Sequence, residues 1–243
     1  MNTYELDIHT HTIASGHGSH ATITDMAKAA AAKGLRLLGI SDHGPATAGG
    51  GKPSYFRGLP QAPKKRLGIE MLYGAEINIM DNSGTLDLDD SILKHLDYTI
   101  ASLHPAVKPP GTKEENTKAY IAAVKNPYVQ IIGHCDDSRY PVDYHALLTA
   151  AMQYHAVFEI NAASLRPDGY RGDTRQNNLT IVHLCKHYHY PFLLSSDSHG
   201  TAQIGDFSAI TELLQLADIP KELILNFDCS LLKKFLNSTF LLC

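Results

Sequence analysis

Short apolar runs that are typical of β-strands alternate with helical patterns along this chain of 243 residues. Seven such runs cover residues 4–10, 35–41, 69–79, 96–103, 129–133, 157–161 and 192–196. The clearest helical patterns cover residues 24–33, 113–125, 143–155 and 177–188, with Thr24 as the expected N-cap of the first. Strands that alternate with such helices predict βαβ units and a parallel sheet. Seven units predict an α/β fold closed or nearly closed into a TIM-like barrel, although an open doubly wound sheet would give the same local pattern.

Length and composition fit one globular domain. Barrels of this class commonly run to about 250 residues, so we expect a single domain over residues 1–243. The formal net charge of −4 argues against a general nucleic-acid-binding face, which is usually basic. We expect no signal peptide, because no charged segment followed by an apolar run is found at residues 1–30; no apolar stretch reaches the roughly 18 residues of a membrane helix, and the four cysteines form no CxxC pair. These features predict a cytoplasmic protein with free thiols and no membrane partner.

Two segments depart from the regular alternation. Residues 44–68 are rich in glycine, proline and basic residues, which predicts a long loop with one helical piece. The glycines at 49–51 are not followed by GK[ST], so they do not predict a phosphate-binding loop. The apolar stretch at residues 230–243 is expected to pack either on the barrel or on a second copy of the chain, as a homo-oligomer would require.

Residues that bind metals well close most of the strand-like runs or follow them closely. Because the carboxyl ends of parallel barrel strands meet at one end, residues about 190 apart in sequence are expected to converge there. Imidazole and carboxylate are good ligands for divalent first-row metals, and this number of them suits two or three ions better than one. The candidate ligands are His9, His11, His17, His43, Glu76, His104, His134, Asp197 and His199.

Alternation within a strand predicts which side chains project together. Asp7, His9 and His11 should share one face, with Asp7 orienting one imidazole through a ring N–H. Asp197 and His199 should share a face in the same way. Glu159 and Asn161 also share a strand face, where supporting the ligands and a purely structural role are equally expected.

For several of these residues a structural or solvated role is an alternative to metal binding. His17 could be a solvated loop histidine with His20 as its rival, His104 could cap a strand end, and Glu76 could be an interior salt-bridge partner; we favour ligation for all three. Cys135 is expected to be a packed thiol. The remaining histidines should lie on outer faces, at positions His95, His145, His155, His183, His187 and His189. Six basic loop residues could grip a substrate but are expected to be solvated, namely Lys52, Arg57, Arg66, Arg139, Arg166 and Arg171.

The motifs that contain these ligands resemble those of the PHP (polymerase and histidinol phosphatase) family of metal-dependent phosphoesterases, and most of all its small bacterial single-domain phosphatases. The matching pieces are DIHTHT, SDHG, the glutamate of YGAEIN, SLH, IGH and SDSH, together with HTHTIASGH and the pair Asn116-Thr117. The resemblance implies a distorted (βα)7 barrel. In the sequence Cys135 and Asp136 follow His134, where relatives often have proline and glycine; this departure removes no ligand.

The resemblance also implies a trinuclear site of divalent ions, Zn and/or Mn, with Fe as a further option. One ion would take His9, His11, Glu76 and Asp197; a second would take Glu76, His104 and His134; a third would take His17, His43 and His199. Three such ions carry about +6 against about −2 from the two carboxylates, which favours an anionic substrate.

A small phosphate monoester fits this charge best, with a hydroxide that bridges two ions as the nucleophile. Glu76, Asp197 and His199 are the candidates for catalytic roles. Two alternatives stay open: an amidohydrolase that cleaves C–N bonds, which would commonly use a lysine where this chain has His104, and a metal-bound module without activity that serves a partner. Histidinol phosphate, a nucleotide, a sugar phosphate and phosphotyrosine all remain candidate substrates.

Overall fold

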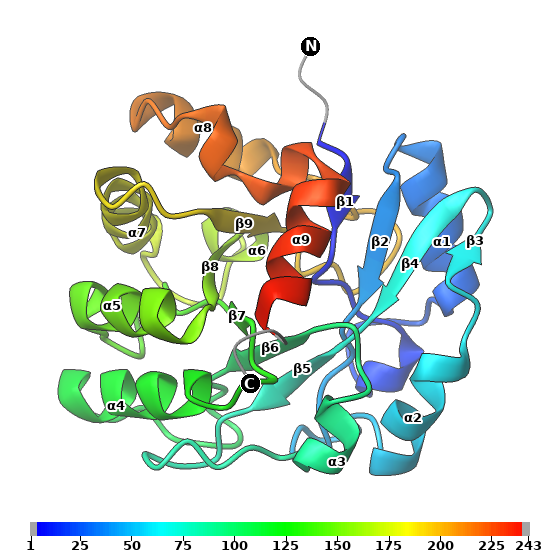
Figure 1. Ribbon diagram of the computed structural model, residues 1–243, viewed down its shortest axis with the longest axis horizontal. Coiled ribbons are helices and arrows are strands. Elements are labelled where there is room, and N and C mark those ends of the chain that lie inside the picture. The colour runs from blue at the N-terminus through cyan, green and yellow to red at the C-terminus, as the bar shows by residue number, and fades with distance from the viewer. Residues whose placement is uncertain (1–3, 240–243) are drawn as a thin grey trace.

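The computed structural model describes residues 4–239, and its strands form two sheets that face each other around a barrel (Figure 1). The first sheet has the order β1 (Leu6–Asp7), β2 (Leu37–Ile40), β4 (Ile69–Tyr73) and β3 (Lys65–Arg66). The second has the order β5 (Ala75–Asn78), β6 (Thr99–Ser102), β7 (Ile131–Ile132), β8 (Val157–Asn161) and β9 (Phe192–Ser195). All pairings are parallel except that of β3 with β4, an antiparallel hairpin that the strand pattern did not predict.

The two sheets are joined on both sides, which makes the barrel that the alternation predicted. The single run expected at residues 69–79 is divided at Gly74 into β4 and β5, which belong to different sheets. A Cβ at Gly74 would lie 2.6 Å from the Tyr98 carbonyl oxygen, so glycine allows this close approach. Parallel bridges His43–Glu76 and Thr10–Ser198 then connect the sheets on either side. The predicted TIM-like α/β barrel is therefore confirmed in distorted form.

Helices cover the outside of the barrel, and Figure 1 shows α4, α5 and α7 in a row beside the second sheet. The predicted helices correspond to α1 (Ile23–Ala32), α4 (Lys113–Val124), α5 (Tyr144–Tyr154) and α7 (Arg175–His187). The expected N-cap of α1 at Thr24 is wrong: Thr22 accepts the Asp25 backbone N–H, and the Asp25 side chain accepts the Thr22 N–H in return. This reciprocal capping satisfies two backbone donors at the start of the helix.

Several elements had no clear sequence pattern. Residues 44–68 hold more structure than one helical piece, because α2 (Pro53–Gly58), a 3₁₀ turn (Leu59–Gln61) and β3 all fall there. The other additions are α3 (Asp90–Leu93), α6 (Ala162–Leu165), α8 (Ser208–Leu216), α9 (Cys229–Thr239) and 3₁₀ turns at Ile13–Ser15, Lys221–Leu223 and Leu225–Phe227. Within residues 4–239, no helix combines the length and apolar character that crossing a bilayer requires.

A separate apolar core fills the barrel below the strand ends. Leu6, Ile8 and Ile100 of the barrel pack there against Leu232 and Phe235 of α9, whereas a larger core lies between the strands and the outer helices. Figure 1 shows α9 lying across the barrel beside β1. The expectation that the C-terminal apolar stretch packs on the barrel thus holds for Leu232, Phe235 and Leu236, while residues 240–243 lie outside the described part of the chain.

Candidate metal centre

Glu76 lies at the middle of the predicted ligands. It is fully buried on β5, and its Oε2 lies 2.7 Å from His43 Nδ1 and 3.4 Å from His9 Nε2. Its Oε1 lies 2.8 Å from His134 Nε2 and 3.3 Å from His104 Nε2. Four strand ends therefore direct imidazoles at one carboxylate, an arrangement suited to a carboxylate that bridges two ions.

Asp197 gathers a second set of imidazoles just beyond β9. Its Oδ1 lies 3.3 Å from His11 Nε2, 3.5 Å from His199 Nδ1 and 3.8 Å from His9 Nε2. The residue has a φ of +51°, and His134 also has a positive φ of +24°. Two predicted ligands thus adopt backbone conformations that are uncommon for residues other than glycine, a type of strain that concentrates at functional sites.

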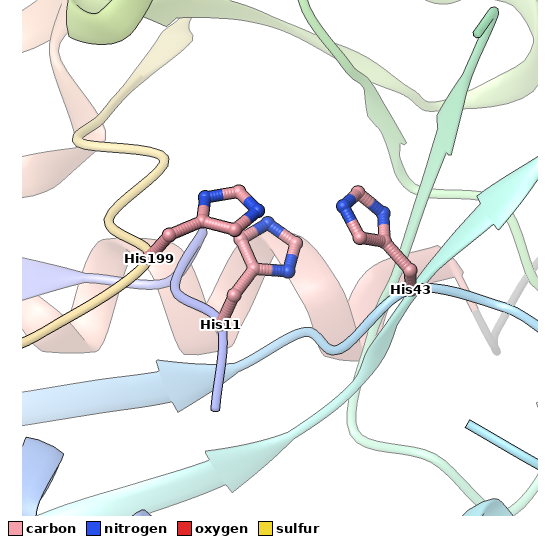
Figure 2. Close-up of side chains that lie close together, drawn as sticks. All are labelled: His11, His43 and His199. Carbon is pink, nitrogen blue, oxygen red and sulfur yellow. The ribbon is translucent and has the colours of Figure 1, made fainter. Parts of the chain in front are cut away.

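The rings of His11, His43 and His199 also contact one another beside these two carboxylates, and His17 joins them. Figure 2 shows the rings of His11, His43 and His199 side by side, with centroid separations of 4.3 Å for His11–His43 and 4.1 Å for His11–His199. The ring of His17 lies 4.8 Å from that of His43 and 5.2 Å from that of His199. The structure therefore brings all nine candidate side chains to one rim, including the loop residue His17; His20 is exposed and takes no part in these contacts.

Hydrogen bonds to the Nδ1 atoms determine which nitrogen three of the histidines present. His9 Nδ1 lies 2.5 Å from Glu159 Oε1, and His104 Nδ1 lies 2.8 Å from the Asn78 side-chain oxygen. His11 Nδ1 lies 2.9 Å from Ser15 Oγ. A carboxylate and an amide oxygen can only accept, so His9 and His104 each carry a proton on Nδ1 and turn Nε2 toward Glu76.

Asp42 determines, through Ser15, which nitrogen of His11 carries the proton. Its carboxylate accepts hydrogen bonds from Ser15 Oγ at 2.7 Å and from the Thr12 backbone N–H at 2.6 Å, and also from Tyr55. Because the Ser15 hydroxyl donates to Asp42, it accepts from His11 Nδ1, which leaves His11 Nε2 as an acceptor. The SDHG motif therefore supplies both a candidate ligand and, in Asp42, the anchor of another ligand.

The donor atoms fit divalent ions. Six buried atoms of this cluster have no hydrogen-bond partner within residues 4–239: His9 Nε2, His11 Nε2, His43 Nδ1, Glu76 Oε2, His134 Nδ1 and His199 Nε2. Buried polar atoms are rarely left unpaired, and these belong to ligand types that first-row metals prefer. Three groups bring their ligand atoms within 4.8 Å of one another: His9–His11–Glu76, His43–Glu76–His104 and His11–His43–His199.

The first of these groups matches an expected ligand set, whereas the other two regroup the residues. His43 was expected with His17 and His199 only, yet its Nδ1 approaches Glu76. His11 was expected at the first ion only, yet its ring stacks on His43 and His199. The three expected sets therefore overlap in the structure, because the imidazole rings form one continuous cluster of stacked, tilted and edge-on contacts.

Burial keeps several of these histidines neutral. Burial, followed by the neighbouring His43 and His199, holds the pKa of His11 well below its usual value. Burial lowers the pKa of His104 to about 4, although Glu76 opposes the shift. Burial also lowers the pKa values of His17 and His199. Near neutral pH these rings carry free lone pairs, as metal ligands must.

In the charged members of the cluster, neighbouring charges outweigh burial and shift the pKa values in favour of the ionised form. Burial alone would lower the pKa of His9, but Glu159, Glu76 and Asp197 outweigh it and raise that pKa well above the usual value. Burial alone would raise the pKa values of Glu76 and Asp197, but His43, His104 and His9 hold that of Glu76 far below its usual range, and His9 and Arg171 do the same for Asp197. Both carboxylates are therefore ionised, and an ion that binds His9 must first displace a proton.

Two sequence-based expectations about supporting residues are wrong. Asp7 does not orient a histidine: its carboxylate accepts the backbone N–H groups of Ser196 and Gly205 at 3.3 and 2.8 Å. Regular pairing of β1 ends at Asp7, so the strand alternation does not extend through His9. Glu159 has the orienting role instead, and its Oε2 also accepts the His134 backbone N–H at 2.7 Å.

Arg171 is the second correction, because it is not a solvated loop residue. Only 2% of it is exposed, and its guanidinium donates to Asp197 Oδ2 at 2.7 Å, to Ser164 Oγ at 3.1 Å and to Asn161 Oδ1 at 3.3 Å. It holds one oxygen of Asp197 and leaves Oδ1 facing the imidazoles. The local sequence does not indicate this burial, because the residues around Arg171 are as polar as those of a solvent-exposed loop.

The predictions of a packed thiol at Cys135 and of histidines on outer faces are largely confirmed. Cys135 is a buried free thiol whose pKa is raised well above the usual value, mainly by burial. Five of the histidines assigned to outer faces are exposed: His95, His145, His183, His187 and His189. His155 is half-buried, and its ring stacks on Phe235 of α9 with centroids 4.1 Å apart.

Comparison with known proteins agrees with this geometry. The sequence pattern of the PHP domain matches residues 7–165, which include seven of the nine candidate ligands. The chain belongs to the PHP family. It is 42% identical to a probable phosphatase of Clostridium novyi over 97% of this chain and 95% of that protein, and 43% identical to one of Caldanaerobacter subterraneus over 95% and 90%. The family that the motifs predicted is thereby confirmed.

The fold of this PHP-family member also matches a solved structure. The crystal structure of histidinol phosphate phosphatase from Lactococcus lactis, complexed with zinc, L-histidinol and phosphate, aligns with a TM-score of 0.62 and 20% identity. The alignment covers 90% of this chain and 95% of that protein. This likeness supports the barrel fold.

Proposed function

We propose that this protein is a phosphatase that hydrolyses a small phosphate monoester at a centre of three divalent metal ions. The predicted enzyme class, a hydrolase of phosphoric esters, is borne out by the relatives, which are probable phosphatases. The number of ions and the kind of ester are proposals that go beyond what the relatives support. They are supported above all by one observation: five histidines, each with one buried and unpartnered nitrogen, surround two ionised carboxylates at the carboxyl ends of the strands.

The ligands would hold three ions in overlapping sets. Glu76 would be shared by two ions, and Asp197 would hold an ion while the Arg171 guanidinium retains its Oδ2. His17, His43 and His199 would supply the third position. The set contains nitrogen and oxygen donors only, which suits zinc and manganese and also admits iron.

The charge of the loaded centre would select the substrate. When bound, the ions would supply positive charge to the phosphoryl oxygens and lower the pKa of a water nucleophile. The ligands return little negative charge, and buried Arg171 adds a further positive charge beside Asp197. A dianionic phosphate ester is therefore preferred over a neutral amide.

Among the candidates for catalytic roles, His199 is the one that lies nearest to solvent. Its side chain is 25% exposed, whereas those of His9 and His11 are fully buried. Asp197 and Glu76 act by holding and orienting the centre, and Glu159, Ser15 and Asn78 keep the histidine nitrogens aimed into it.

A metal and activity assay tests the proposal. Elemental analysis of the untreated protein should give about three equivalents of Zn, Mn or Fe. Release of phosphate from 4-nitrophenyl phosphate should stop after chelation and return with Mn or Zn. His11→Ala should lower both metal content and activity, whereas His183→Ala, an exposed histidine on α7, should change neither. Metal-loaded protein that is inert toward a broad panel of phosphate esters would contradict the proposal.

The same assay addresses the alternatives. His104 faces Glu76 at the end of β6, the position where an amidohydrolase would commonly carry its bridging lysine. Hydrolysis of cyclic amides in place of phosphate esters would favour that class. Metal binding without any turnover, together with a His11→Ala variant that functions normally in cells, would favour a module without activity.

A further inference from the structure

Tyr170 lies at the rim of the candidate centre and has no role in the function proposed so far. It belongs to the loop between α6 and α7, and 65% of the residue is exposed. Its neighbour Arg171 is buried against Asp197. A large aromatic side chain thus stands in solvent directly beside a residue that contacts the predicted metal ligands.

One nitrogen atom connects this tyrosine to the centre. The same guanidinium nitrogen of Arg171 donates to Asp197 Oδ2 at 2.7 Å and to the Tyr170 hydroxyl oxygen at 3.0 Å. The guanidinium carbons of Arg171 and Arg139 lie 4.9 and 5.3 Å from the centre of the Tyr170 ring. Two cation–π contacts and one hydrogen bond therefore hold the hydroxyl next to Asp197.

The hydroxyl hydrogen is free to be donated. In its bond with Arg171 the phenol oxygen is the acceptor, because a guanidinium can only donate. Within residues 4–239, no group accepts the hydrogen of Tyr170 itself. The hydroxyl is thus fixed through its oxygen and still has a proton to offer to a bound molecule.

The position of Tyr170 would place it beside the leaving group of a bound phosphate ester. The predicted ligands that hold the ions are mostly buried, so the phosphoryl group would lie deep while the organic part of the ester would point toward solvent. Tyr170 stands at that outer boundary. A proton donor there would meet the oxygen that links phosphorus to the organic group.

We propose that Tyr170 is a catalytic residue that protonates the leaving-group oxygen; this inference rests on the proposed phosphatase function. Water forms the new bond to phosphorus, the bond from phosphorus to the leaving oxygen breaks, and that oxygen takes the Tyr170 proton. The phenolate is stabilised beside the Arg171 guanidinium and regains a proton from solvent. The attacking water releases one proton to solvent, so protons balance over the cycle.

Tyr170→Phe tests this role, because it keeps the ring and removes only the hydroxyl. The control is Tyr188→Phe: Tyr188 is 39% exposed, and its hydroxyl bonds His145 on the outer helices. We would measure kcat/KM of the metal-loaded proteins on phenyl phosphate, which has a poor leaving group, and on 2,4-dinitrophenyl phosphate, which has a good one. Metal content and affinity for inorganic phosphate, measured by calorimetry, are independent readouts.

The proposal expects Tyr170→Phe to lose about 100-fold on phenyl phosphate and about threefold or less on the dinitrophenyl ester, since general acids matter most for poor leaving groups. Metal content and phosphate affinity should stay at wild-type values, and Tyr188→Phe should match wild type throughout. Equal losses on both esters, no loss, or weakened phosphate binding would overturn the role of Tyr170 alone. Wild-type protein inert toward both esters would overturn the proposed function and this inference with it.

Discussion

Glu159 orients two candidate ligands at once, although it is not among the predicted ligands itself. One oxygen accepts His9 Nδ1–H and the other accepts the His134 backbone N–H. Asn161 donates to Glu159 Oε2 at 3.1 Å and to Asp197 Oδ2 at 3.2 Å, so it connects this carboxylate to the second one. Groups that fix a ligand's ring orientation commonly contribute a large share of metal affinity.

Replacing Glu159 by glutamine should therefore weaken the centre without unfolding the protein. The amide keeps the shape of the buried side chain but can present its NH₂ to His9, which disfavours the required tautomer. We expect metal affinity to fall about 10–100-fold, measured by titration against a competing chelator. Glu114→Gln on the exposed face of α4 is the matched control. Unchanged affinity in Glu159→Gln would show that His9 is oriented by other contacts.

A close contact between two glycines holds the loop that carries His17. Gly16 has a φ of +79°, and a Cβ there would lie 2.1 Å from the backbone of Gly49. Gly34 offers a matched comparison, because its φ is +80° but no atom lies within 4 Å of the position of a Cβ. Both positions have a left-handed φ that strains any other residue, and only Gly16 adds a collision.

Gly16→Ala should displace His17 and reduce metal binding, whereas Gly34→Ala should not. Each variant should lose about 1–2 kcal/mol of unfolding free energy from the left-handed backbone, and Gly16→Ala should lose more. Urea unfolding and elemental analysis of both proteins would check this. A Gly16→Ala protein with full metal content would show that the loop tolerates the shift or that His17 is not a ligand.

At the scale of elements, α9 completes the inner core of the barrel. Leu232 is fully buried in the cluster that contains Leu6 and Ile8, while the adjacent Leu231 is 41% exposed. Asn226, just before α9, donates to the carbonyl oxygens of Leu6 and Leu194 and so ties this segment to two strands. The helix acts on the apolar core and makes no contact with the candidate ligands among the described hydrogen bonds and ring contacts.

Leu232→Ala should therefore cost stability and leave the chemistry intact. Removing a fully buried leucine side chain typically lowers the free energy of unfolding by about 2–5 kcal/mol. Leu231→Ala, one position away on the same helix, should change it by about 0.5 kcal/mol or less. Urea unfolding gives both values, and metal content of the folded fraction should match wild type. Comparable losses in the two variants would mean that α9 is not packed as described.

The whole molecule should respond to pH through its buried histidines. In metal-free protein, the folded pKa of His104 is about 4, below its unfolded value of 6.5. The unfolded chain therefore binds a proton first as pH falls, so this stabilisation is full above about pH 6.5 and is lost toward pH 4. His11, with its lowered pKa, acts in the same direction, whereas His9 has a raised pKa and opposes it.

Stability of chelated protein should accordingly fall between pH 6.5 and 4, with His104 contributing a slope of up to about 1.4 kcal/mol per pH unit. His104→Gln should flatten the curve over that window, and His183→Gln should leave it unchanged. Urea unfolding at a series of pH values is the measurement. An identical slope in His104→Gln and wild type would contradict the neutral, buried state assigned to this imidazole.

Local patterns were sufficient to predict the parallel strands, four of the helices and the candidate ligands at the strand ends. They failed where the outcome depends on distant partners. The run at residues 69–79 reads as one strand, and only packing against Tyr98 shows why it divides at Gly74. Arg171 lies in a polar loop, and only the fold buries it against Asp197.

The sequence by itself determined the α/β class with parallel strands and the set of candidate ligands, because strand period and strand-end chemistry are encoded in neighbouring residues. The tertiary structure alone decided how those ligands are aimed. His9 presents Nε2 because Glu159, 150 positions away in the chain, accepts its Nδ1–H. Asp7 lost the expected orienting role because regular pairing of its strand ends there. Orientation depends on contacts between segments that only folding brings together, and no local pattern records them.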